Sequence, residues 1–294
     1  MFSLAEILTP ALQLNVLDIG AMPEGVPRYQ PLADNFATHV VGFEPNQEQF
    51  QKLAQDANVT YLPYFLGDGQ QATFHVTRYP GCCSLYRPNA AVIDLFETIG
   101  CAEPGGNFHV TGTEQVATVR LDDVYPLERC DFIKADVQGA ELDILKHGVA
   151  VLESTLVIET EAAFVELYEG QPLFGDLQVY LREHGFVLHK MLDIAGRTFR
   201  PLQRGDNPFA PISQMLWADA IFVRDFSKLE NFDAAGLLRA AAILHDMYLS
   251  YDLVLMLLAE HDRRHQSGYG LAYQNAVKAL PELPIAYLSQ RLNP

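Results

Sequence analysis

The sequence predicts an α/β fold, a doubly wound and largely parallel sheet followed by a helical extension. Three observations lead to this prediction. Strand-like apolar runs alternate with stretches of helix length, several of these runs are almost continuously apolar, and the C-terminal part changes to helical periodicity. The chain has 294 residues, 49% of them hydrophobic, which is enough for one large domain with a core and a small appendage.

Seven apolar runs are expected to form the strands of this sheet. Their composition is typical of parallel strands that are covered on both faces. They are 15–20 (NVLDIG), 38–44 (THVVGFE), 59–67 (VTYLPYFLG), 131–136 (DFIKAD), 155–161 (TLVIETE), 185–190 (GFVLHK) and 215–224 (MLWADAIFVR).

Residues 71–121 interrupt this alternation. The stretches 71–78 and 115–121 have the two-residue period of half-exposed strands. Between them lies the insertion loop, residues 79–107, which is rich in Pro, Gly and Cys and long enough to act as a lid. We therefore expect a hairpin insertion within a domain that spans residues 1–227.

The remainder, 228–294, is expected to be a helical appendage. Two runs of helical period, 233–249 and 250–266, end at an SGYG turn, and a shorter helical stretch precedes PELP at 281–284. Their apolar residues are expected to pack as helix faces rather than to anchor the chain in lipid. The appendage would cap the fold and offers a surface for homo-oligomerisation.

Charge and composition exclude several classes of partner. Twenty basic against 37 acidic residues give a net charge of −17, which would repel a nucleic-acid backbone. No segment approaches the length of an apolar membrane span, and the N-terminus does not resemble a secretory leader, so we expect a cytoplasmic protein without membrane insertion. The four cysteines fit neither disulfide nor zinc-ligand spacing.

The loop after the first strand indicates which cofactor the sheet binds. A dinucleotide turn needs glycines at its first, third and sixth positions, but here these are Gly20, Met22 and Gly25, and no Walker A loop occurs. S-adenosylmethionine (SAM) has no pyrophosphate, and its ammonium group suits an acid such as Asp18. Glu44, at the end of the second strand, is expected to accept hydrogen bonds from both ribose hydroxyls.

Three further positions complete the expected cofactor site. Asp68, after the third strand, is placed to accept from the adenine amino group, and Gly20, Ala21 and Asn46 lie in the first two loops. Any one acid at a strand end can simply cap a helix. Three acids at successive strand ends are a stronger signal, because the carboxyl ends of parallel strands face one crevice.

The chain also resembles the FkbM family of SAM-dependent methyltransferases. The stretches that carry the resemblance are 17–21 (LDIGA), 41–46 (VGFEPN), 81–89 (GCCSLYRPN), 119–124 (VRLDDV), 131–148 (DFIKADVQGAELDILKHG), 157–186 and 215–224. The resemblance implies a class I methyltransferase fold, Rossmann-like with seven strands and the last one antiparallel. It also implies an O-methyltransferase for hydroxyls of sugars or natural products. The first loop, GAMPEG, departs from the usual glycine-rich turn.

Methyl transfer from a sulfonium requires an aligned oxygen nucleophile and a group that takes its proton. Asp136 and Glu161, after the fourth and fifth strands, are our catalytic candidates, with Asp136 also contacting the cofactor. Glu159 shares a face with Glu161 and is expected to bind the acceptor. The cluster could alternatively hold Mg²⁺, which we do not favour. Glu141 is expected to interact with a helix N-terminus rather than to act in catalysis.

The insertion loop supplies the remaining acceptor contacts. Ser84, Arg87 and Asn89 suit a polyol, although turn structure explains them nearly as well. The expected partner is therefore a small-molecule or glycan acceptor. His261 and His265 have the spacing of a zinc helix, but two arginines between them argue against a metal.

Two classes of function stay open from the sequence. The first is a SAM-dependent O-methyltransferase acting on a carbohydrate, glycolipid or secondary metabolite. The alternative is a non-catalytic scaffold with a methyltransferase fold, which uses its helical tail to bind protein. The unusual first loop favours the scaffold, whereas the joint presence of Asp18, Glu44, Asp68 and Asp136 favours the enzyme.

Overall fold

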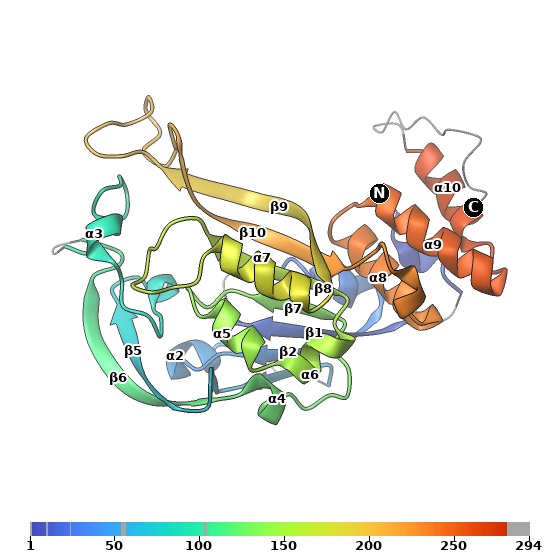
Figure 1. The fold of residues 1–294 in the computed structure, drawn as a ribbon, viewed down its shortest axis with the longest axis horizontal. Coiled ribbons are helices and arrows are strands. Elements are labelled where there is room, and N and C mark those ends of the chain that lie inside the picture. The colour runs from blue at the N-terminus through green and yellow to red at the C-terminus, as the bar shows by residue number, and fades with distance from the viewer. Residues whose placement is uncertain (1, 10, 24, 54–56, 103–104, 281–294) are drawn as a thin grey trace. The chain divides into compact units, whose positions relative to one another are not determined.

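A computed structural model describes residues 2–280, except 10, 24, 54–56 and 103–104 (Figure 1). The chain divides into two compact units. The larger unit consists of Asn15–Gly25 and His39–Phe226, and the smaller consists of Met1–Leu14, Val26–Thr38 and Ser227–Pro294. The predicted appendage extends to 294, and its residues 281–294 lie outside the described part of the chain.

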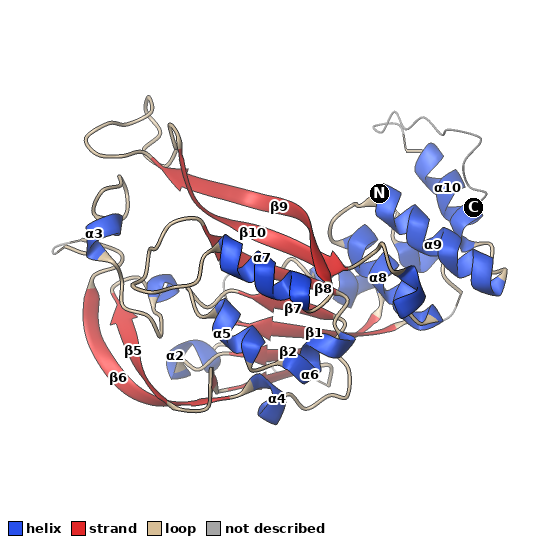
Figure 2. Cartoon of the chain, viewed as in Figure 1, coloured by secondary structure: helices blue, strands red, loops and turns tan. Residues whose placement is uncertain are grey.

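The main sheet has seven strands in the order β3-β2-β1-β7-β8-β10-β9 (Figure 2). The pairs β1–β7, β7–β8 and β2–β3 are parallel, and β10 is antiparallel to both of its neighbours. This confirms the predicted Rossmann-like sheet with its last strand antiparallel. The strands are β1 (Gln13–Ile19), β2 (Ala37–Phe43), β3 (Val59–Leu62), β7 (Phe132–Ala135), β8 (Val157–Ala163), β9 (Phe186–Arg197) and β10 (Gln214–Arg224).

The predicted strand at 59–67 is two strands in the structure. β3 ends at Leu62, and the two-residue β4 (Phe65–Leu66) joins a second, three-stranded sheet. Pro63 follows Leu62 directly, and a proline has no N–H to continue the pairing. The apolar pattern alone does not show this change of sheet.

Helices α5 (Glu141–Lys146), α6 (Val149–Ser154) and α7 (Phe174–Glu183) lie along the main sheet (Figure 1). Their apolar side chains form a buried core with alternate residues of the strands, among them Leu17, Ile133 and Ile158. Because side chains alternate between the faces of a strand, Asp18, Lys134 and Glu159 lie on the opposite face.

The insertion forms its own small sheet and core. β5 (Gln71–Thr77) pairs antiparallel with β6 (Val110–Val119), and β6 also pairs with β4. The insertion loop contains a 3-10 turn (Pro80–Cys82) and α3 (Ala90–Ile93). The second core consists of Cys82, Ile93, Phe96, Ile99, Phe108, Leu167, Tyr168 and Leu216. The loop thus packs on the segment that follows β8 and on β10. The short helices α2 (Gln47–Phe50) and α4 (Leu121–Val124) complete the larger unit.

The smaller unit is helical. It contains short turns at Leu4–Glu6 and Leu229–Asn231, and the helices α1 (Gln30–Asn35), α8 (Ala234–Asp246), α9 (Tyr251–His265) and α10 (Tyr269–Lys278). The imidazole of buried His245 contacts the Tyr273 hydroxyl and the Phe2 carbonyl oxygen, each at 2.9 Å. These bonds join α8 to α10 and to the N-terminal segment. None of the described helices is long and apolar enough to cross a bilayer.

Candidate functional site

Three charged side chains form a row across the main sheet. The strand register places Asp18 beside Lys134 and Lys134 beside Glu159. The Lys134 ammonium lies 3.2 Å from Asp18 Oδ1. Burial by itself would lower the pKa of Lys134, but attraction to Asp18, Asp136 and Glu159 outweighs burial and raises it. Lys134 is therefore a charged ammonium group that lies between the carboxylates of Asp18 and Glu159.

The turn after β1 is fixed to the ends of the neighbouring strands. The N–H groups of Gly20 and Ala21 both donate to the Phe43 carbonyl at 3.0 Å, and Lys134 Nζ donates to the Gly20 carbonyl at 3.3 Å. Gly20 has φ +82°, and a Cβ there would lie 2.0 Å from the Asp136 carbonyl oxygen. Only glycine fits, because the Asp136 backbone passes against it.

Glu44 follows β2 and is buried near this row. Its Oε1 accepts the Asn46 N–H at 2.7 Å, and Asn46 Oδ1 in turn caps α2 by accepting from the amides of Glu48 and Gln49. Burial raises the pKa of Glu44, and the nearby Asp18 raises it further. Asn46 therefore orients the Glu44 carboxylate and starts the following helix.

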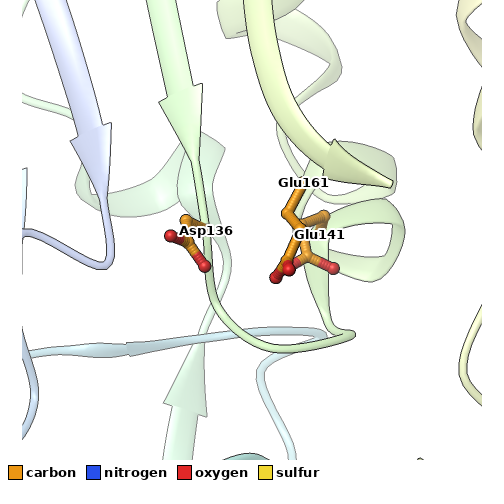
Figure 3. A group of neighbouring side chains, drawn as sticks. All are labelled: Asp136, Glu141 and Glu161. Atoms are coloured by element: carbon orange, nitrogen blue, oxygen red, sulfur yellow. The ribbon is translucent and has the colours of Figure 1, made fainter. Parts of the chain in front are cut away.

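Three more carboxyl groups meet near the carboxyl ends of β7 and β8. Figure 3 shows Asp136 on the turn after β7, and Glu161 on β8 next to Glu141 of α5. One oxygen from each lies within 4.8 Å of the others. Burial raises the pKa of Glu161 well above its usual range, and the negative charge of Asp136 adds to the effect.

Glu141 has a structural role in this group. It lies in the first turn of α5, as expected, and its carboxylate accepts the N–H groups of Val137 and Gly139 at 2.9 to 3.1 Å. Burial raises the pKa of Glu141 to about 7 despite these bonds. It holds the turn between β7 and α5.

Residues that sequence reasoning did not select complete the site. Gln138 Nε2 donates to Asp136 Oδ1 and to Glu161 Oε2, each at 2.9 Å. Asp219 lies opposite Glu161 in the β8–β10 register. Lys134 and Asp219 are single charges within apolar strands, a signal that the sequence does contain.

The other predicted site residues lie at the insertion. Asp68 Oδ1, in the turn between β4 and β5, accepts from the Gln70 N–H at 2.9 Å. Ser84 is buried, and its hydroxyl donates to the Gln138 carbonyl at 2.7 Å. Arg87 is exposed, 3.9 Å from Glu169, and Asn89 Nδ2 donates to the Glu166 carbonyl at 3.0 Å. Their contacts with cofactor or acceptor stay predictions.

Comparison with known proteins gives a family match. A family model described as the methyltransferase FkbM domain matches residues 18–188. The 2-O-methyltransferase NoeI of Sinorhizobium fredii (strain NBRC 101917 / NGR234) is 48% identical over 63 residues, which are 20% of this chain and 26% of NoeI. The match thus spans about a quarter of that relative's length.

Solved structures with a similar arrangement are distant. The 23S rRNA methyltransferase ErmE is 12% identical with a TM-score of 0.33, over 87% of this chain and 80% of that one. The SAM complex of LepI is 10% identical with a TM-score of 0.31, over 76% of this chain and 47% of that one.

Proposed function

The chain belongs to the FkbM methyltransferase family, and we propose that it transfers a methyl group from SAM to a hydroxyl of a carbohydrate, glycolipid or secondary metabolite. The observation that carries the proposal is the pair Asp136 and Glu161. Their carboxyl groups meet at the ends of β7 and β8, where ligands bind in open α/β sheets, close to the charged row of Asp18 and Lys134.

The residues at the ends of β1 and β2 suit SAM as the methyl donor. The Glu44 carboxylate is oriented by a single bond to the Asn46 N–H, which leaves acceptor capacity for ribose hydroxyls. Asp18 supplies negative charge for the ammonium end of the donor. The Gly20–Ala21 turn follows Asp18 and bonds to the carbonyl of Phe43, the residue before Glu44. We assign Asp68 to the adenine amino group as part of the same proposal.

The acceptor side relies on the two carboxyl groups. When SAM is bound, it supplies a methyl carbon on sulfur, and the acceptor oxygen bonds to that carbon as the C–S bond breaks and its electron pair stays on sulfur. Glu161 takes the hydroxyl proton as general base. The raised pKa makes the ionised Glu161 carboxylate a stronger base than a solvated one, and Glu161 acts after the pair has released its own proton. Asp136 orients the hydroxyl, and Glu159, Ser84, Arg87 and Asn89 are proposed acceptor contacts.

A binding experiment tests the cofactor assignment. Equilibrium dialysis with labelled SAM should show binding by the natural protein and a loss of at least about 100-fold in affinity for Glu44→Ala, because hydrogen bonds to a charged acceptor contribute about 1.5–3 kcal/mol each and Glu44 is expected to accept two. Glu48→Ala is the matched control, since Glu48 is an exposed α2 carboxylate paired with Lys52. Undiminished binding by Glu44→Ala would contradict the ribose assignment.

Methyl transfer to a panel of sugars and glycolipids then identifies the acceptor. Absence of both SAM binding and transfer would favour the scaffold alternative. The division into a methyltransferase domain (1–227) and a helical appendage (228–294), and homo-oligomerisation through that appendage, remain proposals.

A further inference from the structure

The turn that carries Gln138 is held in one conformation. Gln138 has φ +60° and Gly139 has φ +106°, so two consecutive residues are left-handed. The Glu141 carboxylate bonds to the amides on both sides of Gln138, those of Val137 and Gly139. Because the backbone is fixed at both flanks, the Gln138 side chain leaves the turn in a defined direction.

All polar groups of the Gln138 side chain have partners. Nε2 donates to Asp136 and Glu161, and Oε1 accepts from the Tyr168 hydroxyl at 3.1 Å. When both carboxyl groups are ionised, the reversed amide would point its carbonyl oxygen at two negative charges, which would be repulsive. The observed orientation is the one in which a neutral donor lies between two acids.

The other end of this contact is Tyr168, which lies in the segment after β8 and packs against the insertion loop. Tyr168 is 2% exposed, lies in the second core with its ring 5.7 Å from that of Phe108, and its hydroxyl also lies 3.0 Å from the Cys82 carbonyl oxygen. The Ser84 hydroxyl donates to the Gln138 carbonyl. The loop therefore contacts the Gln138 backbone directly through Ser84, and it reaches the Gln138 side chain indirectly, through the Tyr168 hydroxyl that Cys82 also binds.

We propose that Gln138 is a positioning residue that couples the insertion loop to the Asp136–Glu161 pair. With Tyr168 in place, the amide is held so that both of its N–H groups face the carboxyl groups, and the ionised form of the pair is stabilised. The inference rests on the proposed function in one respect, that Glu161 is the base which this donor prepares.

The surroundings of the pair make this donor important. Glu161 is half-buried and faces Asp136 from the turn after β7, Glu141 from α5 and Asp219 from β10, and all three disfavour its ionisation. Tyr168 faces it from the segment after β8 and Cys82 from the insertion loop, and Lys134 acts on Asp136 from within β7. A hydrogen bond to the charged form opposes these effects. Without the Gln138 amide, the pair should keep its proton to higher pH.

The test measures both ends of the coupling without requiring an acceptor or SAM. Carboxyl ¹³C NMR of protein labelled at glutamate, with the Glu161 signal assigned from Glu161→Gln, follows the titration of the pair. Hydrogen exchange at the amides of Asn89 and Glu169, which bond to Leu167 and Arg87, follows the attachment of the loop. The variants are Gln138→Met, which has similar length but no donor, and Tyr168→Phe, which lacks only the hydroxyl.

In Gln138→Met the Glu161 titration should move up by about one pH unit. Tyr168→Phe should move it in the same direction by less and should speed exchange at the two reporter amides by roughly fivefold. The double variant should titrate like Gln138→Met, since both changes act through one amide. Tyr125→Phe is the matched control, because its hydroxyl donates to the Arg129 carbonyl away from the pair, and it should change neither readout.

An unchanged Glu161 titration in folded Gln138→Met would overturn the proposal. So would a Tyr168→Phe protein in which amide exchange is faster but the titration matches the natural protein. If Gln138→Met does not fold, the Tyr168→Phe result decides alone. Failure to bind SAM would count against the proposed function and leave these readouts standing, so the two failures are distinguishable.

Discussion

Glu141→Gln should remove most of one pH-dependent contribution to stability. Glu141 is 4% exposed, and both of its amide partners, Val137 and Gly139, lie within 3.1 Å of a single oxygen, Oε1. Glutamine retains an oxygen that can accept both bonds. The variant therefore keeps both bonds to Oε1, and it loses the ionisable group and the second contact of the Gly139 amide, 3.0 Å from Oε2.

The sign of the effect follows from the direction of the pKa change. The pKa of Glu141 is raised from its ordinary 4.5 to about 7 by burial, so between these values the folded protein holds a proton that the unfolded chain has released. Stability from this group is full below about pH 4.5 and is lost as pH rises towards 7. At about 1.4 kcal/mol per pH unit, the loss approaches 3 kcal/mol.

Urea unfolding at several values between pH 4.5 and 8 measures this contribution. The stability of Glu141→Gln relative to the natural protein should rise by about 3 kcal/mol across the range. The control is Glu153→Gln, at an exposed carboxyl group on α6. Its free energy of unfolding should change with pH in the same way as that of the natural protein. If the stability of Glu141→Gln changes with pH in the same way as that of the natural protein, then burial does not raise the pKa of Glu141 as we infer.

Two further substitutions test how the sheet edge is built. Lys134→Met leaves Asp18 and Glu159 buried without the cation between them. We expect the free energy of unfolding, measured in urea, to fall by about 3 kcal/mol. A fall of less than about 1 kcal/mol would contradict the stabilising role of the charged row. Gly20→Ala should lower the thermal midpoint far more than Gly25→Ala, because both glycines have positive φ but only a Cβ at Gly20 meets backbone, the Asp136 carbonyl. Equal effects would mean that backbone strain alone matters there.

The sequence was sufficient for the sheet and for the acids at its edge. Apolar runs and their endings predicted the strands, since burial on both faces leaves a clear local pattern. Asp18, Glu44 and Asp136 were predicted to lie at one edge of the sheet because the carboxyl ends of parallel strands meet there, and the structure brings them near one another, while their roles stay predictions. The break at Pro63 was missed because strand propensity continues across it, whereas the hydrogen-bonding partner changes.

The tertiary structure alone decided which groups meet. The neighbours of Lys134 follow from the β1–β7–β8 register, and Asp219 faces Glu161 only because β10 pairs antiparallel with β8. Gln138 lies two residues from Asp136, but its other partners, Glu161 and Tyr168, are 23 and 30 residues away in the chain. The periodicity of a segment shows which of its residues are buried, but it does not show which residue of another strand lies beside each of them. The sequence by itself therefore determined the fold and the acids at the edge of the sheet. The charge state of those acids depends on their neighbours, which only the pairing of the strands decided.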